Sequence, residues 1–367
     1  MVLRVGIVSA GWGAFSHLPA WRAIPGVEVT SICTSRQETA EAAQNRLGLP
    51  RAFWDAEAMC ADPDIDIVDL GTRPSIRKSM ALAALKHGKH IYNASPHAPD
   101  WASAKQIDAA WKAGSSIGVV DAFSEYIPAL AQMKAMVDAG YLGDAYGGTC
   151  HFNISLFNAP IKQFPYNWFA DGSAGVSAVR NNGSHALYLL THMFGPVAEL
   201  VADDSQVLKT WLFPDGDIVV PETNDFANVI LKFASGLTMQ MQISWSMPLY
   251  DGFLIDVFGS KGRLVAKSPT FPTAIDCTLE GGQLGGTMEA VSVPDALRVV
   301  DGIGVDWQNP IQPSFPMALS MHAMVQAIHG RGTAAPDFAR AFDIERLQEA
   351  IRLSSAERRW VRPTDVV

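Results

Sequence analysis

The chain begins with a short apolar run, a glycine turn, a helical segment and a second apolar run. Val5-Gly6-Ile7-Val8 predicts a buried β-strand, and Gly11-Trp12-Gly13 predicts a tight turn directly after it. The helical pattern of residues 14–24 is ended by Pro25-Gly26, and residues 27–33 predict a second strand. Together these elements predict a βαβ unit with a right-handed crossover.

The same alternation continues to about residue 122. Strands are predicted at 66–70, 89–92 and 117–120, and helices at 75–87 and 101–113. Strands interleaved with helices in this way are typical of a doubly wound parallel α/β domain, which binds ligands at the carboxyl ends of its strands. We therefore predict a dinucleotide-binding domain over residues 1–122.

After this point the hydrophobic period changes. Residues 226–233 and 238–245 alternate apolar and polar positions on either side of a short glycine-containing turn, which predicts a hairpin, and 253–258 with 263–266 predict another. Helices are expected at 182–194, 317–329 and 344–357. This pattern predicts an α+β domain over residues 123–367, with an open-faced and largely antiparallel sheet.

Composition and charge narrow the classes of function. The 367 residues suffice for two domains, and a net charge of −9 without any basic run argues against a nucleic-acid partner. The four cysteines are far apart, which argues against a disulfide framework or a zinc site and predicts a cytoplasmic protein. No apolar run approaches the roughly 18 residues of a membrane span, so no membrane partner is expected.

The glycine turn is the first candidate binding site. Ser9, Gly11 and Ala14 fill the three positions of the G-x-G-x-x-G/A dinucleotide fingerprint, and Gly11-x-Gly13-x-x-Ser16 is an alternative register. A glycine in the middle position lets the backbone approach a pyrophosphate, which a helix N-terminus then attracts. The predicted contacts in this turn are Ser9, Gly11, Trp12, Gly13 and Ala14.

The second strand ends without the acidic residue that holds the ribose hydroxyls of NAD(H). The chain instead has Thr34-Ser35-Arg36, and an Arg suits the 2′-phosphate of NADP(H). We therefore expect Thr34, Ser35 and Arg36 to contact the cofactor, with NADP(H) favoured and NAD(H) possible. Ser35-x-x-Glu38 also fits a capping box that starts the next helix, and the two interpretations are compatible.

Further motifs resemble the Gfo/Idh/MocA family of nicotinamide-dependent sugar oxidoreductases. They are His17 after the glycine turn, the run from Ala81 to His90, Tyr141-Leu142-Gly143-Asp144, and Gly183-Ser184-His185. The resemblance extends over nearly the whole chain. It implies an N-terminal Rossmann domain, a small-molecule substrate, and a homodimer or homotetramer formed through the C-terminal sheet.

The chain departs from the family pattern at positions of proton transfer. The family's Glu-Lys-Pro turn supplies a Lys to the nicotinamide ribose and the reacting hydroxyl, and here it is Ala94-Ser95-Pro96. The family's Asp-x-Gly-x-His stretch becomes Asn181-Asn182-Gly183-Ser184-His185. These changes affect the expected chemistry more than cofactor binding. By resemblance, the remaining cofactor contacts are Thr72, Arg73, Pro74, Arg77, Ser95 and Pro96.

His185 is the candidate general acid/base, because the ordinary pKa of His lies close to 7. If residues 182–194 are helical, Asn181, Tyr188 and His192 share one stripe with it. Asn181 would orient the substrate or His185, Tyr188 would donate a hydrogen bond, and His192 suits the helix end. Lys162, in an aromatic loop, and His97 are candidates to replace the missing Lys. The alternative interpretation of Lys162 is a solvated Lys on a surface loop.

These features predict an oxidoreductase that transfers a hydride between NAD(P) and a hydroxyl or carbonyl of a sugar-like or cyclic alcohol substrate. One alternative is a redox-neutral lyase, hydrolase or isomerase that uses bound NAD(P) transiently. A second alternative is a non-catalytic sensor that binds the nucleotide.

Overall fold

The computed structural model describes residues 2–161, 166–309 and 313–367. The chain forms two compact units, the first made of Met1–Tyr126 and Arg298–Phe342 and the second of Ile127–Leu297 and Asp343–Val367. This division differs from the predicted one, which assigned every residue after 122 to the second domain. Among the described helices, none is both long enough and apolar enough to cross a membrane.

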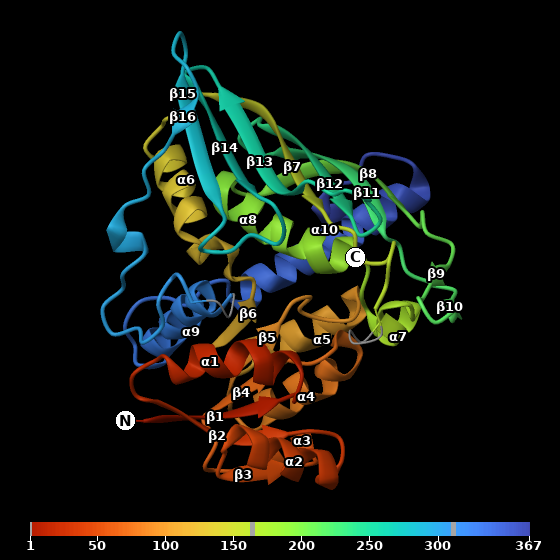
Figure 1. The fold of residues 1–367 in the computed structure, drawn as a ribbon, viewed down its shortest axis with the longest axis vertical. Helices are drawn as coiled ribbons and strands as arrows, with labels where there is room; N and C mark the ends of the chain where they lie inside the picture. The colour runs from red at the N-terminus through yellow and green to blue at the C-terminus, as the bar shows by residue number, and fades with distance from the viewer. Residues whose placement is uncertain (1, 162–165, 310–312) are drawn as a thin grey trace. The chain divides into compact units, whose positions relative to one another are not determined.

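The first unit is built on a six-stranded parallel sheet with the order β3-β2-β1-β4-β5-β6 (Figure 1). This order confirms the doubly wound class. Its strands are β1 (Leu3–Val8), β2 (Val27–Cys33), β3 (Arg51–Phe53), β4 (Ile67–Leu70), β5 (His90–Ala94) and β6 (Gly118–Asp121). Its helices are η1 (Gly13–His17), α1 (Leu18–Arg22), α2 (Gln37–Leu47), α3 (Ala56–Ala61), α4 (Pro74–Lys86), α5 (Trp101–Lys112), η2 (Phe123–Tyr126), α9 (Ser314–Ile328) and the start of α10 (Phe338–Glu357).

The helical segment predicted over residues 14–24 is present, but it is not one regular α-helix and it ends at Arg22. The structure has a π-helical turn, η1, followed by the five-residue helix α1. Pro19 lies in the first turn of α1 and has no N–H, so it cannot donate the hydrogen bond that would continue a regular α-helix from the preceding residues. The wider π turn ends at His17, which is buried.

Residues 298–342 return to the first unit because they complete its packing. Gly118, at the start of β6, leaves room for the ring of Phe338, which a Cβ at that position would approach to 2.6 Å. Pro336 accepts a backbone hydrogen bond from Val120, and Arg340 forms a 2.6 Å ion pair with Glu125. The return of a late segment to an early sheet has no signature in local hydrophobic patterning.

The second unit is built on an eight-stranded sheet with the order β16-β15-β14-β13-β7-β12-β11-β8. Its longer strands are β7 (Ala145–Asn153), β8 (Val197–Ser205), β11 (Phe226–Phe233), β12 (Thr238–Ser244), β13 (Gly252–Gly259), β14 (Gly262–Ser268) and β15 (Thr278–Gln283). Shorter ones are β9 (Trp211–Leu212), β10 (Ile218–Val219) and β16 (Glu289–Ala290). Its helices are α6 (Pro128–Asp138), α7 (Tyr166–Phe169), η3 (Gly172–Ala174), η4 (Val179–Gly183), α8 (Ser184–Phe194), η5 (Asp295–Leu297), the rest of α10 and η6 (Pro363–Asp365).

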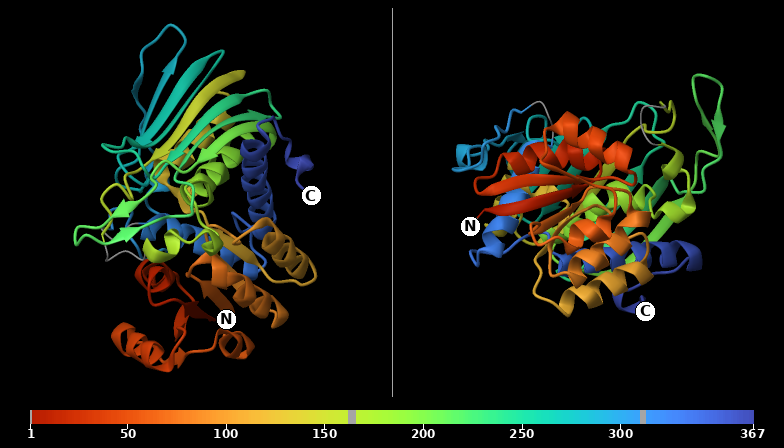
Figure 2. Two further views of the ribbon diagram at one scale, coloured as in Figure 1. Left: turned by 90° about the vertical axis from the view of Figure 1, so that its right-hand side faces the viewer. Right: turned by 90° about the horizontal axis from the view of Figure 1, so that it is seen from below.

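Only β7 and β12 pair in parallel within this sheet, and the other neighbours are antiparallel. Helices α6, α8 and α10 lie along one face of it, as the two views of Figures 1 and 2 show. The strands alternate accordingly, so that in β11 Val229 and Leu231 are buried while Ile230 and Lys232 are exposed. These findings confirm the predicted open-faced, largely antiparallel class.

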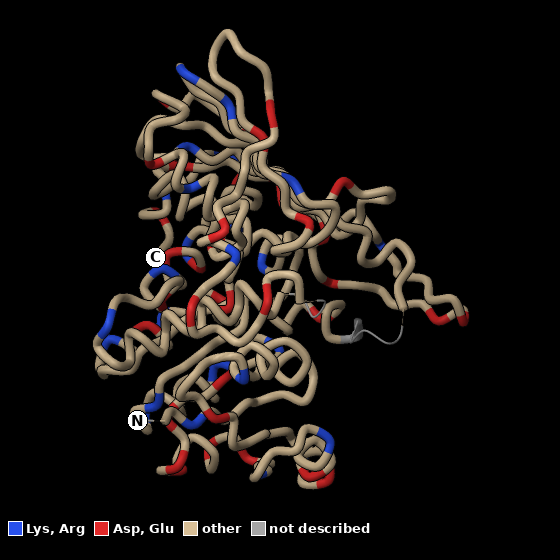
Figure 3. Tube along the Cα trace, turned by 60° about the vertical axis from the view of Figure 1, so that its left-hand side comes forward, with Lys and Arg blue, Asp and Glu red and all other residues tan. Residues whose placement is uncertain are grey.

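Charged residues of both signs are interspersed along both units (Figure 3). All four cysteines are buried as free thiols. Within the described ranges, no group of three or more His, Cys, Asp or Glu side chains is arranged to hold a metal ion.

Candidate functional site

The glycine turn after β1 has a backbone suited to the fingerprint register that begins at Ser9. Ser9 has a φ of 128°, in the region that favours glycine, and its hydroxyl accepts a 3.0 Å hydrogen bond from the Gly11 N–H. A Cβ on Gly11 would meet only the Ser9 hydroxyl, at 3.4 Å, whereas one on Gly13 would approach Ile7 to 2.8 Å. Gly11 therefore leaves open space at the turn, and Gly13 is needed for packing.

The turn is held against the end of β4. Gly13 donates a 3.3 Å hydrogen bond to the carbonyl of Gly71, and a Cβ on Gly71 would lie 2.6 Å from the Gly13 Cα. The next residue, Thr72, therefore lies near the glycine turn, where ligands bind in this class of sheet. Trp12 is 44% exposed, while Ala14 is buried.

The end of β2 presents an exposed Arg. Ser35 and Arg36 are exposed, and the Arg36 guanidinium has no hydrogen-bond partner in the described parts of the chain. The capping box predicted at Ser35 is wrong, because the N-cap of α2 is Arg36 and no side chain caps it. Thr34 and Thr39 instead both donate hydrogen bonds to the Arg36 carbonyl, so the helix starts one residue later than the box requires.

Of the two arginines near the start of α4, only one faces solvent. Arg73 is the exposed N-cap residue, followed by Pro74 in the first turn. Arg77 is 1% exposed and donates to the backbone carbonyls of Ala94 and Pro96. Its guanidinium thus supports the turn that carries Ser95, which is half-buried. In the structure Arg77 stabilises this turn through its hydrogen bonds and is not exposed where a cofactor could contact it.

His97 is also part of the interior of the first unit. It is 2% exposed, its Nδ1 lies 3.1 Å from the side-chain amide of Asn93, and its ring packs edge-on against Phe338. The geometry is that of a structural His. The proposal that it replaces the missing Lys gains no support from this placement.

A buried charged cluster below the glycine turn was missed by the sequence interpretation. His17 lies between two carboxylates, with Nδ1 at 2.7 Å from Asp69 and Nε2 at 3.0 Å from Asp121. Burial alone lowers the pKa of His17, but the two carboxylates raise it to about 10. The indoles of Trp21 and Trp12 donate to Asp69 and Asp121 respectively. The signal in the sequence that could have predicted this cluster is the presence of acidic residues within buried strands, Asp69 in β4 and Asp121 at the end of β6.

In the second unit, the predicted helical stripe is interrupted. Asn181 lies in the π-helical turn η4, and the regular helix α8 begins only at Ser184. Asn181 and His185 are half-buried, whereas Tyr188 is 2% exposed. The ring of His185 meets Phe271 edge-on, with 5.1 Å between centroids. Asn181 and His185 therefore lie on either side of a π-to-α junction, and Tyr188 is part of the core.

This junction is tied to α10 by a partly buried ion pair. Arg180, one residue before Asn181, lies 2.7 Å from the carboxylate of Glu345, which is 1% exposed. Gly183 packs closely on β12, where a Cβ would meet Ile243 at 3.5 Å. The side-chain amide nitrogen of Asn182 is buried without a hydrogen-bond partner among the described residues.

Lys162 and Phe164 lie outside the described residues. At the start of the same aromatic segment, Phe157 is buried and stacks on Trp211 with 3.8 Å between ring centroids. Trp245 packs edge-on against Phe157. Phe157 is thus a core residue of the second unit.

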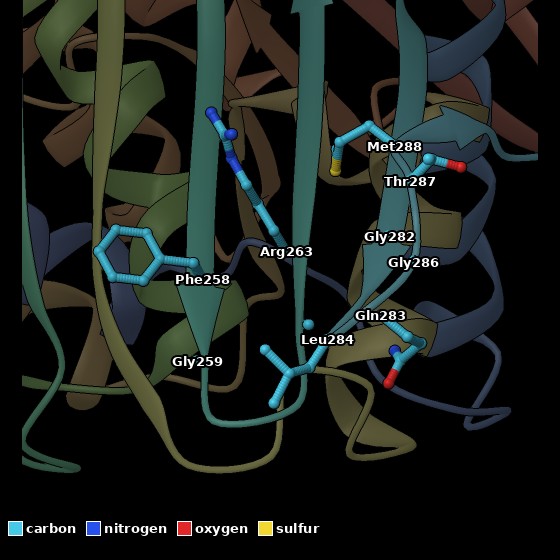
Figure 4. Close-up of a pocket in the computed structure, with 10 residues that line it drawn as sticks. Phe258, Gly259, Arg263, Gly282, Gln283, Leu284, Gly286, Thr287 and Met288 are labelled. Carbon is cyan, nitrogen blue, oxygen red and sulfur yellow. The ribbon is translucent and has the colours of Figure 1, made fainter.

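A separate pocket of about 220 Å³ lies at the end of the β13–β14 hairpin (Figure 4). Phe258, Arg263, Leu284 and Met288 line it with several glycines. None of the predicted site residues is among its lining residues, so it does not correspond to the predicted reaction centre.

Comparison with family models identifies the chain. Residues 3–121 match the model described as the oxidoreductase family with an NAD-binding Rossmann fold, and residues 130–265 match the GFO/IDH/MocA C-terminal domain. The chain belongs to the Gfo/Idh/MocA family. The resemblance carried by the sequence motifs is thereby confirmed.

Members of the Gfo/Idh/MocA family with assigned names match most of this chain. A D-apiose dehydrogenase of Paraburkholderia graminis is 27% identical over 79% of this chain and 72% of its own length. A levoglucosan dehydrogenase of Pseudarthrobacter phenanthrenivorans is 22% identical over 98% of this chain and 97% of its own length.

Solved structures agree in fold. An NAD-binding oxidoreductase from Klebsiella pneumoniae superposes with a TM-score of 0.87 at 22% identity, and each chain is covered completely. A levoglucosan dehydrogenase in complex with NADH and L-sorbose gives a TM-score of 0.87 at 20% identity, covering 98% of both chains.

Proposed function

We propose that this protein is an NAD(P)-dependent oxidoreductase acting on a hydroxyl or carbonyl of a sugar-like or cyclic alcohol substrate. The observation that carries the proposal is the turn of Ser9 and Gly11, whose strained serine and open glycine leave room for a pyrophosphate at the carboxyl end of β1. The names of the dehydrogenase relatives support a sugar-like substrate. A bound nicotinamide would supply the hydride acceptor or donor.

We assign the proton transfer to His185. When an alcohol is oxidised, its carbon loses a hydride to the cofactor and its oxygen loses a proton, which a neutral imidazole can accept. Asn181, across the π-to-α junction, would orient the substrate through its amide. Tyr188, Lys162 and His97 remain predictions, of which Tyr188 and His97 are buried.

The test of His185 uses a matched histidine on the same helix. The purified protein is incubated with a panel of sugars and cyclic alcohols while the absorbance of reduced nicotinamide and the mass of the products are followed. His185→Ala should abolish turnover, and His192→Ala, in the last turn of α8, should retain it. Unchanged turnover of His185→Ala would refute its role.

We propose NADP(H) as the preferred cofactor because Arg36 is exposed at the end of β2, where no acid is present. Charge-assisted hydrogen bonds to a phosphate imply that Arg36→Ala weakens NADPH binding by on the order of tenfold and leaves NADH binding unchanged. The control is Arg22→Ala, which removes another exposed arginine of the same unit. Equal loss for both cofactors in calorimetric titrations would contradict the assignment.

A redox-neutral reaction is the second candidate, because neither Ser95 nor Asn181 can ionise at the positions where the family has Lys and Asp. Product formation without net cofactor conversion in the same assay would favour it. Cofactor binding with neither product nor conversion would favour a sensor.

We also propose a homo-oligomer formed through the helix-free face of the second unit's sheet. Ile230 and Phe258 are 40% and 46% exposed on β11 and β13 of this sheet. Ile230→Asp with Phe258→Asp should convert a dimer or tetramer to monomers in sedimentation experiments, and an unchanged mass would refute this surface.

A further inference from the structure

We propose that Trp12 positions the nicotinamide half of the cofactor, and that the buried chain Asp69–His17–Asp121 holds its indole in place. The inference rests on the proposed use of a nicotinamide dinucleotide. It assigns to one side chain of the glycine turn a role beyond that of the turn's backbone.

The indole of Trp12 is both accessible and anchored. It is 44% exposed, yet its N–H donates a 3.0 Å hydrogen bond to Oδ2 of Asp121, which is 3% exposed. An exposed Trp needs no partner for its N–H, since water satisfies it. A bond to a buried carboxylate restricts the ring instead to one orientation, and a fixed aromatic face is a good stacking surface.

The position of Asp121, which holds the indole, indicates which half of the cofactor Trp12 would contact. In a sheet with this strand order, the end of β2 receives the ribose next to adenine, so the half formed by β4, β5 and β6 receives the nicotinamide portion. Asp121 is the last residue of β6. The indole thus reaches from the pyrophosphate turn toward the nicotinamide half.

His17 determines where the carboxylate of Asp121 lies. Both ring nitrogens of His17 contact carboxylate oxygens, so both must carry protons. Oδ2 of Asp121 accepts from His17 and Trp12 together, and Asp69 accepts from His17 and from the indole of Trp21. A buried cluster of one cation and two anions is a poor source of stability compared with apolar packing, but it fixes geometry well.

The decisive experiment compares a full cofactor with a fragment that lacks nicotinamide. Calorimetric titrations measure the affinity of NADPH or NADH and of 2′-phospho-ADP-ribose or ADP-ribose. Trp12→Leu should lower the affinity for the full cofactor by on the order of tenfold and the affinity for the fragment by less than about twofold. Trp54→Leu, another half-exposed Trp of the same unit, should change neither.

The positioning role is tested by conservative replacement of Asp121. Asp121→Asn retains an acceptor for the indole and should keep most of the preference for full cofactor over fragment, whereas Asp121→Leu should lose about threefold to tenfold of it. A purely structural role would lower both affinities together and leave their ratio unchanged. Thermal melting establishes that each variant is folded, and Trp12→Leu tests the proposal independently of Asp121.

The outcomes separate the two proposals. If the wild type binds full cofactor and Trp12→Leu alters full cofactor and fragment equally, or neither, this inference is overturned while the proposed function stands. If the wild type binds neither full cofactor nor fragment, the proposed function fails and this inference fails with it.

Discussion

Replacing Gly71 by Ala should displace the glycine turn mainly through contacts with its backbone. A Cβ at position 71 would lie 2.6 Å from the Cα and 2.8 Å from the N of Gly13, and 3.3 Å from Nδ1 of His17. The first two are backbone atoms, so no rotamer change relieves the contact. Overpacking of this kind costs about 1–3 kcal/mol. For a unit of this size, we expect the melting temperature to fall by about 2–12 °C.

The same substitution should weaken cofactor binding, because Gly13 and Trp12 must move when the two backbones separate. Gly114→Ala is the matched control, since its Cβ would approach nothing closer than the Trp111 carbonyl at 3.9 Å. Thermal melts with and without NADPH, together with calorimetric affinities, measure both effects. A Gly71→Ala variant with the stability and affinity of Gly114→Ala would refute the close contact between these loops.

Three further substitutions test other parts of the structure. Burial raises the pKa of Asp204 from 3.8 to about 6, so the folded state favours the protonated carboxyl. The contribution of this group to the free energy of unfolding is therefore lost as pH rises through about 6. Asp204→Asn should therefore be more stable than wild type at pH 7, by up to about 3 kcal/mol, and not near pH 4 in denaturant titrations. Arg180→Met removes the guanidinium that pairs with the buried carboxylate of Glu345 and should cost about 3–5 kcal/mol, most of which Glu345→Gln restores in the double variant. Phe338→Ala should cost about 3–5 kcal/mol in the same titrations if residues 298–342 belong to the first unit, and less than 1 kcal/mol would contradict that.

Elements with a strong local pattern were predictable. Strands β4 and β6 of the first sheet are short, largely apolar runs that are buried on both faces, and β11 and β12 alternate between buried and more exposed positions. Both kinds of pattern depend on a residue's nearest neighbours along the chain. The return of Phe338 to the β6 edge depends on space left by Gly118, more than 200 residues earlier, and no local pattern encodes it.

The candidate site was predictable to a smaller extent. The turn at Ser9 and Gly11 could be located because a dinucleotide fingerprint has fixed spacing, and the exposed Arg36 follows from the end of β2. The π-helical turns at Gly13–His17 and Val179–Gly183 were not foreseen, because the hydrophobic period does not distinguish one π turn from the α-helix that follows it. They change which side chains face inward, and this is why Asn181 and His185 do not share a regular helical stripe.

The placement of the ionisable groups in the structure supports His185 as the residue that transfers the proton. The family's turn carries a Lys where this chain has Ser95, and Arg77, which contacts this turn, donates to two backbone carbonyls. His97 is buried beside Asn93, and His17 is held as a cation between carboxylates. A general base must be able to lose its proton near neutral pH, and neither a guanidinium nor this imidazolium can do so. These placements support our proposal that His185, in the second unit, transfers the proton, with Ser95 contributing a hydrogen bond to the cofactor or substrate rather than a charge.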